Sequence, residues 1–205
     1  RPLARQLLAA PRAGLRFGAV ALVAAAALAV APWSAHAQAA PSATELRQMQ
    51  DLLDQGYYNS AARLNGPDLV ARYPNSGEAH YLFARALYLT NDWERAATQL
   101  QLALELLPDP DPHVVNLQGH IRAAQGDTAG ALRALQNAFL RSRLYEHAMD
   151  WGRVAWQSAQ YEEAIQAFDA AAQTERGQRE LWPYVDKGRL LMLLNRWTEA
   201  AQAFT

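Results

Sequence analysis

A short motif recurs at nearly constant spacing along most of this chain of 205 residues. Its clearest copy, residues 91–97, joins a polar turn, an aromatic residue and two alanines. Successive copies lie 35, 35, 33 and 36 residues apart. A period in this range is typical of proteins that stack one small structural unit on the next. The copies are anchored on Ala61, Ala96, Ala131, Ala164 and Ala200.

Each unit has apolar residues at helical spacing on both sides of a short polar turn, which predicts a pair of helices. In the second unit we expect helices over 78–90 and 93–107, joined at Asn91 and Asp92. Short polar side chains favour such a turn because they hydrogen-bond to their own backbone. In the first unit we expect Gly66 and Pro67 to interrupt the second helix. The later units are predicted over 113–143, 145–176 and 181–205.

These repeats resemble the tetratricopeptide repeat, which has small residues where its two helices cross and an aromatic residue that begins the second helix. The resemblance implies an all-α fold, a right-handed superhelical solenoid of antiparallel helix hairpins with about 4.5 units. We expect Trp93, Trp151 and Trp197 to lie in its core. Besides the five alanines, the residues that carry the resemblance are Trp93, Gly119, Gly152, Tyr161, Gly188 and Trp197.

The N-terminal segment has the three-part layout of an export signal. Four arginines precede the apolar run 17–31, and Ala35-His36-Ala37 then supplies a small-x-small cleavage pattern. We therefore predict a signal peptide over 1–37, a flexible leader over 38–43 and the repeat array over 44–205. An uncleaved N-terminal anchor is the alternative. Since the last unit stops within its second helix, we expect a fragment truncated at the C-terminus.

Composition excludes several classes of function. The chain has 19 basic and 20 acidic residues, and four of the arginines precede Glu45, the first acidic residue, which leaves 15 basic and 20 acidic residues beyond them. An acidic body argues against nucleic-acid binding. The absence of cysteine excludes thiolate chemistry. His113 and His120 lack a carboxylate at ligand spacing, and no catalytic motif occurs, so we predict no enzyme, metal or cofactor.

The resemblance also implies that the first helix of each pair lines a concave groove. Arg85, Arg153 and Arg189 would form a basic row there, which favours a protein or peptide partner with acidic groups. The alternative is that these arginines pair with the nearby carboxylates Glu78, Asp150 and Asp186 and remain solvated. The predicted groove residues are Tyr81, Arg85, Tyr88, Asn116, His120, Met149, Arg153, Trp156, Arg189 and Met192.

Three functions are compatible with these features. The first is an exported, non-catalytic scaffold that binds protein or peptide partners outside the cytoplasm, with no membrane span once the signal is cleaved. The second is the N-terminal arm of a larger envelope enzyme or export protein, whose active part would lie beyond Thr205. The third is association of copies through the open end near Phe204.

Overall fold

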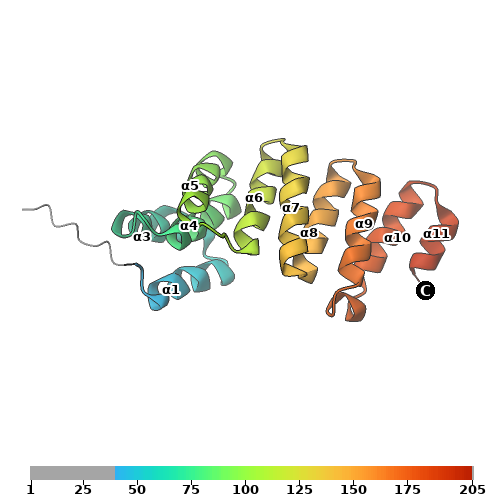
Figure 1. Ribbon diagram of the computed structural model, residues 1–205, viewed down its shortest axis with the longest axis horizontal. Coiled ribbons are helices and arrows are strands. Elements are labelled where there is room, and N and C mark those ends of the chain that lie inside the picture. Colours follow the sequence, from blue (N-terminus) through green and yellow to red (C-terminus); the bar gives the residue numbers. More distant parts are fainter. Residues whose placement is uncertain (1–39, 205) are drawn as a thin grey trace, which may run out of the picture. The chain divides into compact units, whose positions relative to one another are not determined.

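The computed structural model describes residues 40–204, which belong to one compact unit (Figure 1). The predicted signal peptide and the start of the predicted leader lie outside the described residues. Within 40–204 every regular element is helical. The first helix begins at Ala43, where the Ser42 hydroxyl accepts a hydrogen bond from the backbone N–H of Glu45 and the Glu45 carboxylate accepts one from the backbone N–H of Ser42. This reciprocal cap satisfies donors that have no partner within the helix.

The helices follow one another as antiparallel pairs. The second pair is α4 (Gly77–Leu89) and α5 (Trp93–Leu106), close to the predicted bounds. The third pair is α6 (Pro112–Ala124) and α7 (Thr128–Ser142). The remaining elements are α1 (Ala43–Asp54), α2 (Tyr58–Ser60), η1 (Ala61–Asn65), α3 (Gly66–Arg72), α8 (Tyr145–Gln157), α9 (Tyr161–Ala172), η2 (Gly177–Arg179), α10 (Trp182–Leu193) and α11 (Trp197–Ala203).

Each helix packs chiefly on its neighbours in sequence, so the pairs form a stack (Figure 1). The turns between paired helices place Asn91, Ala159 and Asn195 at positive φ, where the chain reverses. Gly126 does the same in the third pair, with a φ of 85°. Such local, sequential contacts define a repeat architecture in which every unit is stabilised by the next.

Small residues set the distance between paired helices. A Cβ atom on Gly119 would lie 2.5 Å from Cγ of Leu135, and one on Gly152 would lie 2.6 Å from the Phe168 ring. The five anchoring alanines are 0–2% exposed. The second helix of each pair therefore lies against the backbone of the first, because no larger residue fits at these crossings.

The first unit differs from the prediction at Gly66 and Pro67, because the helix continues through them. Residues Ala61–Asn65 form a π-helix, and the backbone N–H of Gly66 donates to the carbonyl of Ala61, five residues earlier. A proline inside an α-helix clashes with the carbonyl four residues before it. The wider π turn accommodates Pro67 at the start of α3 and adds one residue to the turn. Leu69 consequently reaches the core, where it is 3% exposed.

Two apolar clusters make up most of the core. The first cluster contains residues from α1 through α5, together with Val114 and Leu117 on the inward face of α6. The other begins at α7, with Leu135 and Phe139, and continues to Ala200 in α11. The α6–α7 pair thus contributes one helix to each cluster, and it connects them.

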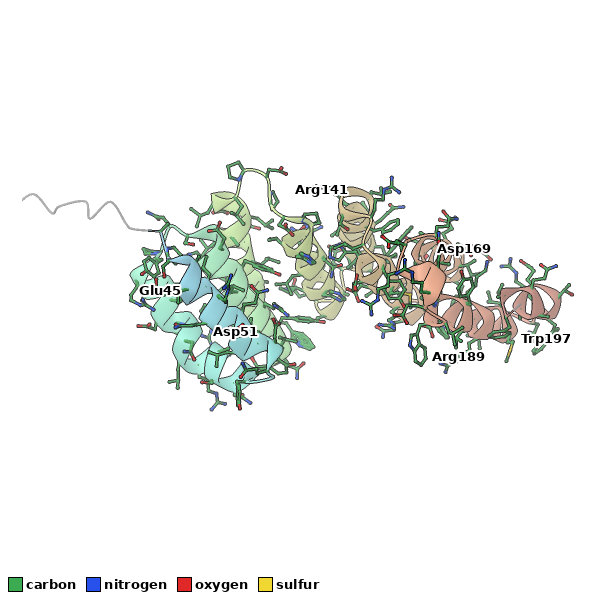
Figure 2. The ribbon with its side chains drawn as sticks, turned by 90° about the horizontal axis from the view of Figure 1, so that it is seen from below. Glu45, Asp51, Arg141, Asp169, Arg189 and Trp197 are labelled. Carbon is green, nitrogen blue, oxygen red and sulfur yellow. The ribbon has the colours of Figure 1, made fainter. Side chains whose placement is uncertain are left out.

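The three tryptophans expected in the core have different environments. Trp151 is 4% exposed and its indole N–H donates to the Glu163 carboxylate at 2.8 Å. Trp93 is partly buried and meets the Tyr88 ring edge-on, with centroids 6.2 Å apart. Trp197, labelled in Figure 2, is 61% exposed, so the expectation of a core position was wrong for this residue. No further helix pair within 40–204 packs over α11 to cover it.

Candidate functional site

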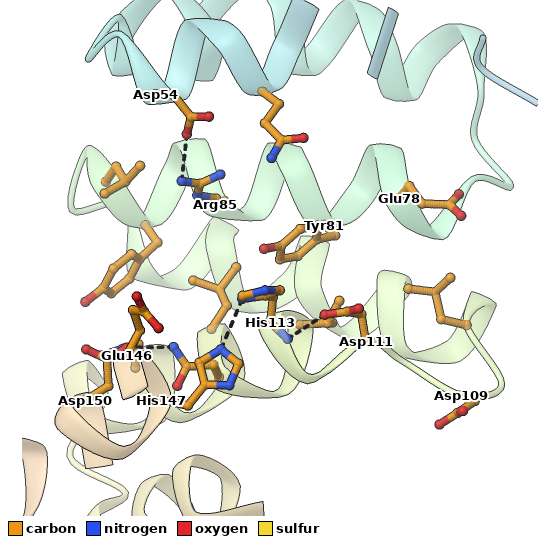
Figure 3. A pocket seen from close by; sticks show the side chains of 18 residues that line it. Asp54, Glu78, Tyr81, Arg85, Asp109, Asp111, His113, Glu146, His147 and Asp150 are labelled. Carbon is orange, nitrogen blue, oxygen red and sulfur yellow. Dashed lines mark hydrogen bonds and ion pairs between the residues drawn. The ribbon is translucent and has the colours of Figure 1, made fainter. Parts of the chain in front are cut away.

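A cavity of about 700 Å³ opens on the face formed by the first helices of successive pairs (Figure 3). Its lining comes from α1, α4, α6 and α8, together with the proline-rich connector that leads from α5 to α6. Helices far apart in sequence therefore contribute to one surface. We call this cavity the α4–α6–α8 pocket.

Half of the predicted groove residues line this pocket. Tyr81, Arg85 and Tyr88 extend from α4, and Asn116 and His120 extend from α6. A smaller cavity of about 320 Å³ further along the stack includes Arg153 and Trp156, with Gln157 and Asp186. Arg189 and Met192 line neither of these two cavities.

Met149 lies in the core rather than on the groove surface, with 2% of its surface exposed. Its repeat position is on the boundary between core and groove, since Tyr81 and Asn116 occupy the matching positions and are partly exposed. A flexible thioether is readily accommodated among apolar neighbours. The next residue, Asp150, lines the pocket instead.

Each arginine of the predicted basic row has a partner within the protein. Arg85 lies 3.1 Å from the Asp54 carboxylate on α1. Arg153 lies 3.8 Å from the Asp186 carboxylate, as the alternative in the sequence analysis proposed. The guanidinium of Arg189 lies over the Trp156 ring, 5.9 Å from its centroid. The charges of Arg85 and Arg153 are therefore matched by neighbouring carboxylates, which weakens the case for an acidic ligand.

The α4–α6–α8 pocket is acidic, with six carboxylates and one guanidinium among its lining residues. The sequence analysis did not place most of these carboxylates in the groove. Two of them belong to the connector before α6 and one to the end of α1, segments outside the first-helix positions on which the prediction relied. The six are Asp54, Glu78, Asp109, Asp111, Glu146 and Asp150.

Asp150 is held by two groups from α6. Its Oδ2 atom accepts a hydrogen bond from Asn116 Nδ2 at 2.9 Å and lies 3.1 Å from His120 Nε2. Burial raises the pKa of Asp150, but the hydrogen bonds from His120 and Asn116 and the charge of His120 outweigh burial and lower it. Asp150 is therefore ionised at neutral pH. Oδ1 of Asn116 is buried and has no hydrogen-bond partner among the described residues.

Two histidines connect α6 and α8 at the edge of the pocket. Nε2 of His147 lies 3.0 Å from Nδ1 of His113 (Figure 3). Nδ1 of His147 lies 2.7 Å from the Ser142 hydroxyl. Burial lowers the pKa of His147, and the nearby His113 lowers it further. Their spacing of 34 residues, one repeat, was the signal in the sequence that could have paired them.

Within 40–204, no group of three or more histidine or acidic side chains is arranged to hold a metal ion. In the same part of the chain, no helix combines the length and apolar character that crossing a membrane requires. The geometry is that of a helical repeat scaffold with a polar concave pocket.

Comparisons with known proteins agree with this class. Residues 52–121 match the family model of the tetratricopeptide repeat. No curated protein sequence matches the chain. Among solved structures, MamA from Desulfovibrio magneticus RS-1 is 20% identical, with a TM-score of 0.65 over 78% of this chain and 89% of that chain.

Two other solved structures share the fold. PilF from Pseudomonas aeruginosa is 18% identical, with a TM-score of 0.65 over 78% of this chain and 72% of that chain. YrrB, described as a tetratricopeptide-repeat protein with an unusual peptide-binding site, is 13% identical, with a TM-score of 0.60 over 82% and 84%. The predicted all-α repeat solenoid is thereby confirmed. The chain thus carries tetratricopeptide repeats over residues 52–121 and shares the fold of tetratricopeptide-repeat proteins.

Proposed function

We propose that this protein is a non-catalytic scaffold that binds a segment of a partner protein in the α4–α6–α8 pocket. The observation that carries the proposal is the pocket itself, which gathers side chains from four helices and a connector into one concave surface. Tyr81 and Tyr88 offer ring faces, while carboxylates and Asn116 offer hydrogen-bond acceptors. Extended or helical peptides bind such mixed surfaces by burying apolar parts and pairing polar ones.

The fold relatives support the same class of activity. YrrB, which shares this fold, is a tetratricopeptide-repeat protein with an unusual peptide-binding site. Repeat solenoids present long concave surfaces because successive units place matching helix faces side by side. A protein partner is therefore the ligand that this architecture favours.

A large side chain introduced at an exposed position of the pocket lining tests the proposal. Gln50 is exposed on α1 and lines the pocket, whereas Gln48 is exposed on the same helix and does not. A displayed random-peptide library selected on the whole chain should yield binders that protect α4, α6 and α8 from hydrogen exchange. Gln50→Trp should weaken these binders about tenfold or more by steric exclusion, and Gln48→Trp should leave them unchanged. Failure to enrich any peptide, or equal effects of the two variants, would contradict the proposal.

We further propose that the protein acts outside the cytoplasm. The support is the arginine-bearing, apolar and small-residue layout of residues 1–37. Expression of the whole chain in a Gram-negative host, followed by cell fractionation and N-terminal sequencing, should give a periplasmic product that begins at Gln38. A product that keeps residues 1–37 and sediments with the inner membrane would instead support a retained anchor.

Self-association is a second candidate interaction, favoured by the apolar side chains on α10 and α11. Trp182, Leu193 and Trp197 are 56%, 59% and 61% exposed. Light scattering over a dilution series should show a mass that falls toward the monomer, and Trp197→Ser should shift this transition to higher concentration. A constant monomer mass at all concentrations would exclude it.

A further inference from the structure

The α4–α6–α8 pocket has carboxylates that the protein itself does not neutralise. Asp54, Asp109 and Glu146 form ion pairs with Arg85, Arg141 and Arg176. Within residues 40–204, neither Glu78 nor Asp111 forms an ion pair, although both line the pocket. In the same residues, the Glu78 carboxylate accepts a hydrogen bond only from the Ser76 hydroxyl at 3.2 Å, and the Asp111 carboxylate only from the backbone N–H of His113 at 2.8 Å.

A second observation concerns hydrogen-bond acceptors. Oδ1 of Asn116 is buried at the pocket wall without a donor among residues 40–204. Leaving a buried acceptor unpaired costs free energy, so a donor from outside the protein would be favourable there. The Asn116 amide cannot turn to solve this, because its Nδ2 already donates to Asp150 at 2.9 Å. The pocket therefore has more acceptors and negative charges than the protein's own donors and cations satisfy.

A third observation is the aromatic surface beside these acceptors. Tyr81 extends into the pocket from α4, on the same helix as Glu78 (Figure 3). Tyr88 lies one to two turns further along and packs against His120, with ring centroids 5.9 Å apart. The faces of such rings attract cations, and they also cover the methylene groups of long basic side chains.

We infer that the partner segment is basic, and that it places a lysine or arginine side chain against Glu78 and Asp111. This assignment rests on the proposed function and reverses the acidic ligand expected from the sequence. A guanidinium or ammonium group supplies only donors and a positive charge, which would pair with the carboxylates of Glu78 and Asp111.

The test starts from peptides enriched by a displayed random library on the whole chain. They should carry net positive charge, and replacing their lysines and arginines by glutamine should abolish binding. The double variant Glu78→Gln with Asp111→Asn should lower affinity about tenfold, since charge-assisted hydrogen bonds are lost. Asparagine keeps the cap of α6 because it is as good a capping residue as aspartate. Affinity for the unaltered chain should also fall as salt rises from roughly 50 mM to roughly 500 mM.

A matched control lies elsewhere in the chain. Glu94 in the first turn of α5 corresponds to Glu78, and Asp127, the cap of α7, corresponds to Asp111. Neither lines the pocket, so Glu94→Gln with Asp127→Asn should leave affinity unchanged. Enriched peptides that are acidic or neutral, and that Gln50→Trp displaces, would overturn the inference while the proposed function stands. Basic peptides that bind both double variants equally would also overturn it. An empty selection would defeat both.

Discussion

His147 and His113 lie within hydrogen-bonding distance of one another, with 3.0 Å between Nε2 and Nδ1, and they join α8 to α6. His147 is 1% exposed, so only one proton can be shared between these two nitrogens without two N–H groups facing each other. Burial and the nearby His113 lower the pKa of His147, while the carbonyl of Ala138 and the carboxylates of Asp150 and Glu146 act in the opposite direction.

We therefore expect stability to fall as the solution becomes mildly acidic. Since the folded pKa of His147 is below 6.5, its value when unperturbed, the unfolded chain binds the proton first. The contribution of His147 is present above pH 6.5 and is lost as pH falls toward the folded pKa. Urea denaturation at several pH values between 8 and 5 should show a decreasing free energy of unfolding, and His147→Gln should flatten that decrease. Parallel curves for the two proteins would contradict the prediction.

A different acid response is expected at the first helix. Hydrogen bonds from the Ser42 backbone and hydroxyl, and then from Arg72 and Tyr73, lower the pKa of Glu45 to about 2. A depressed carboxyl pKa stabilises the fold above pH 4.5, and this contribution is lost as pH falls from there toward 2. Glu45→Gln should reduce the acid sensitivity of the unfolding midpoint in this range. Asp51→Asn on the same helix (Figure 2), which removes a carboxylate without an ion pair in the described chain, should not.

The close crossing of α6 and α7 gives a prediction about packing. A Cβ on Gly119 would lie 2.5 Å from Leu135 Cγ and 3.1 Å from the carbonyl oxygen of Ala131. Overpacking costs about 1–3 kcal/mol, and alanine recovers about 1 kcal/mol in helix propensity, so the net destabilisation by Gly119→Ala should be up to about 2 kcal/mol. In a Leu135→Ala background, which removes the clashing side chain, Gly119→Ala should leave the free energy of unfolding unchanged or raise it. Additive effects in this double-mutant cycle, measured by urea denaturation, would refute the steric explanation.

The variant Arg85→Gln is expected to have opposite effects on the binding of an acidic and of a basic ligand. If the ligand were acidic, Arg85→Gln would weaken binding. In an acidic pocket with a basic ligand, the same change removes the only guanidinium of the lining and releases Asp54 from its ion pair. Affinity for a basic peptide should then rise about two- to fivefold, in keeping with the modest energies of partly exposed ion pairs. Fluorescence anisotropy with a labelled basic peptide would measure this, and unchanged or lower affinity would contradict the prediction.

The sequence predicted the helix pairs well because the repeat period and the small residues act locally. Small residues such as Ala96, Gly119 and Ala131 indicate that two paired helices cross closely at these positions. This inference needs no knowledge of contacts with distant units. The continuous helix through Gly66 and Pro67 was not predictable in this way. The π turn depends on packing at both of its ends. Ala61 at its start and Leu69 after it must both face the core, and the extra residue of the π turn allows this.

The polarity of the pocket was less accessible for a related reason. The sequence places Arg85 in the groove but does not show that Asp54, 31 residues earlier, comes within 3.1 Å of it. The connector 107–111 looks like a plain linker, yet its fold brings Asp109 and Asp111 to the pocket. Net charge at a surface depends on such contacts between units, which periodicity alone does not contain.

The division of the core between α6 and α7 has a consequence for the ligand. Most of the buried apolar side chains of α6 belong to one cluster and most of those of α7 to the other. In a repeat array, parts with separate cores can unfold at different denaturant concentrations. The pocket takes its walls from both sides, with α4 in one cluster and α8 in the other. A bound segment would therefore contact helices of both clusters at once. If the two clusters unfold separately in the free protein, binding would couple them into a single unfolding transition.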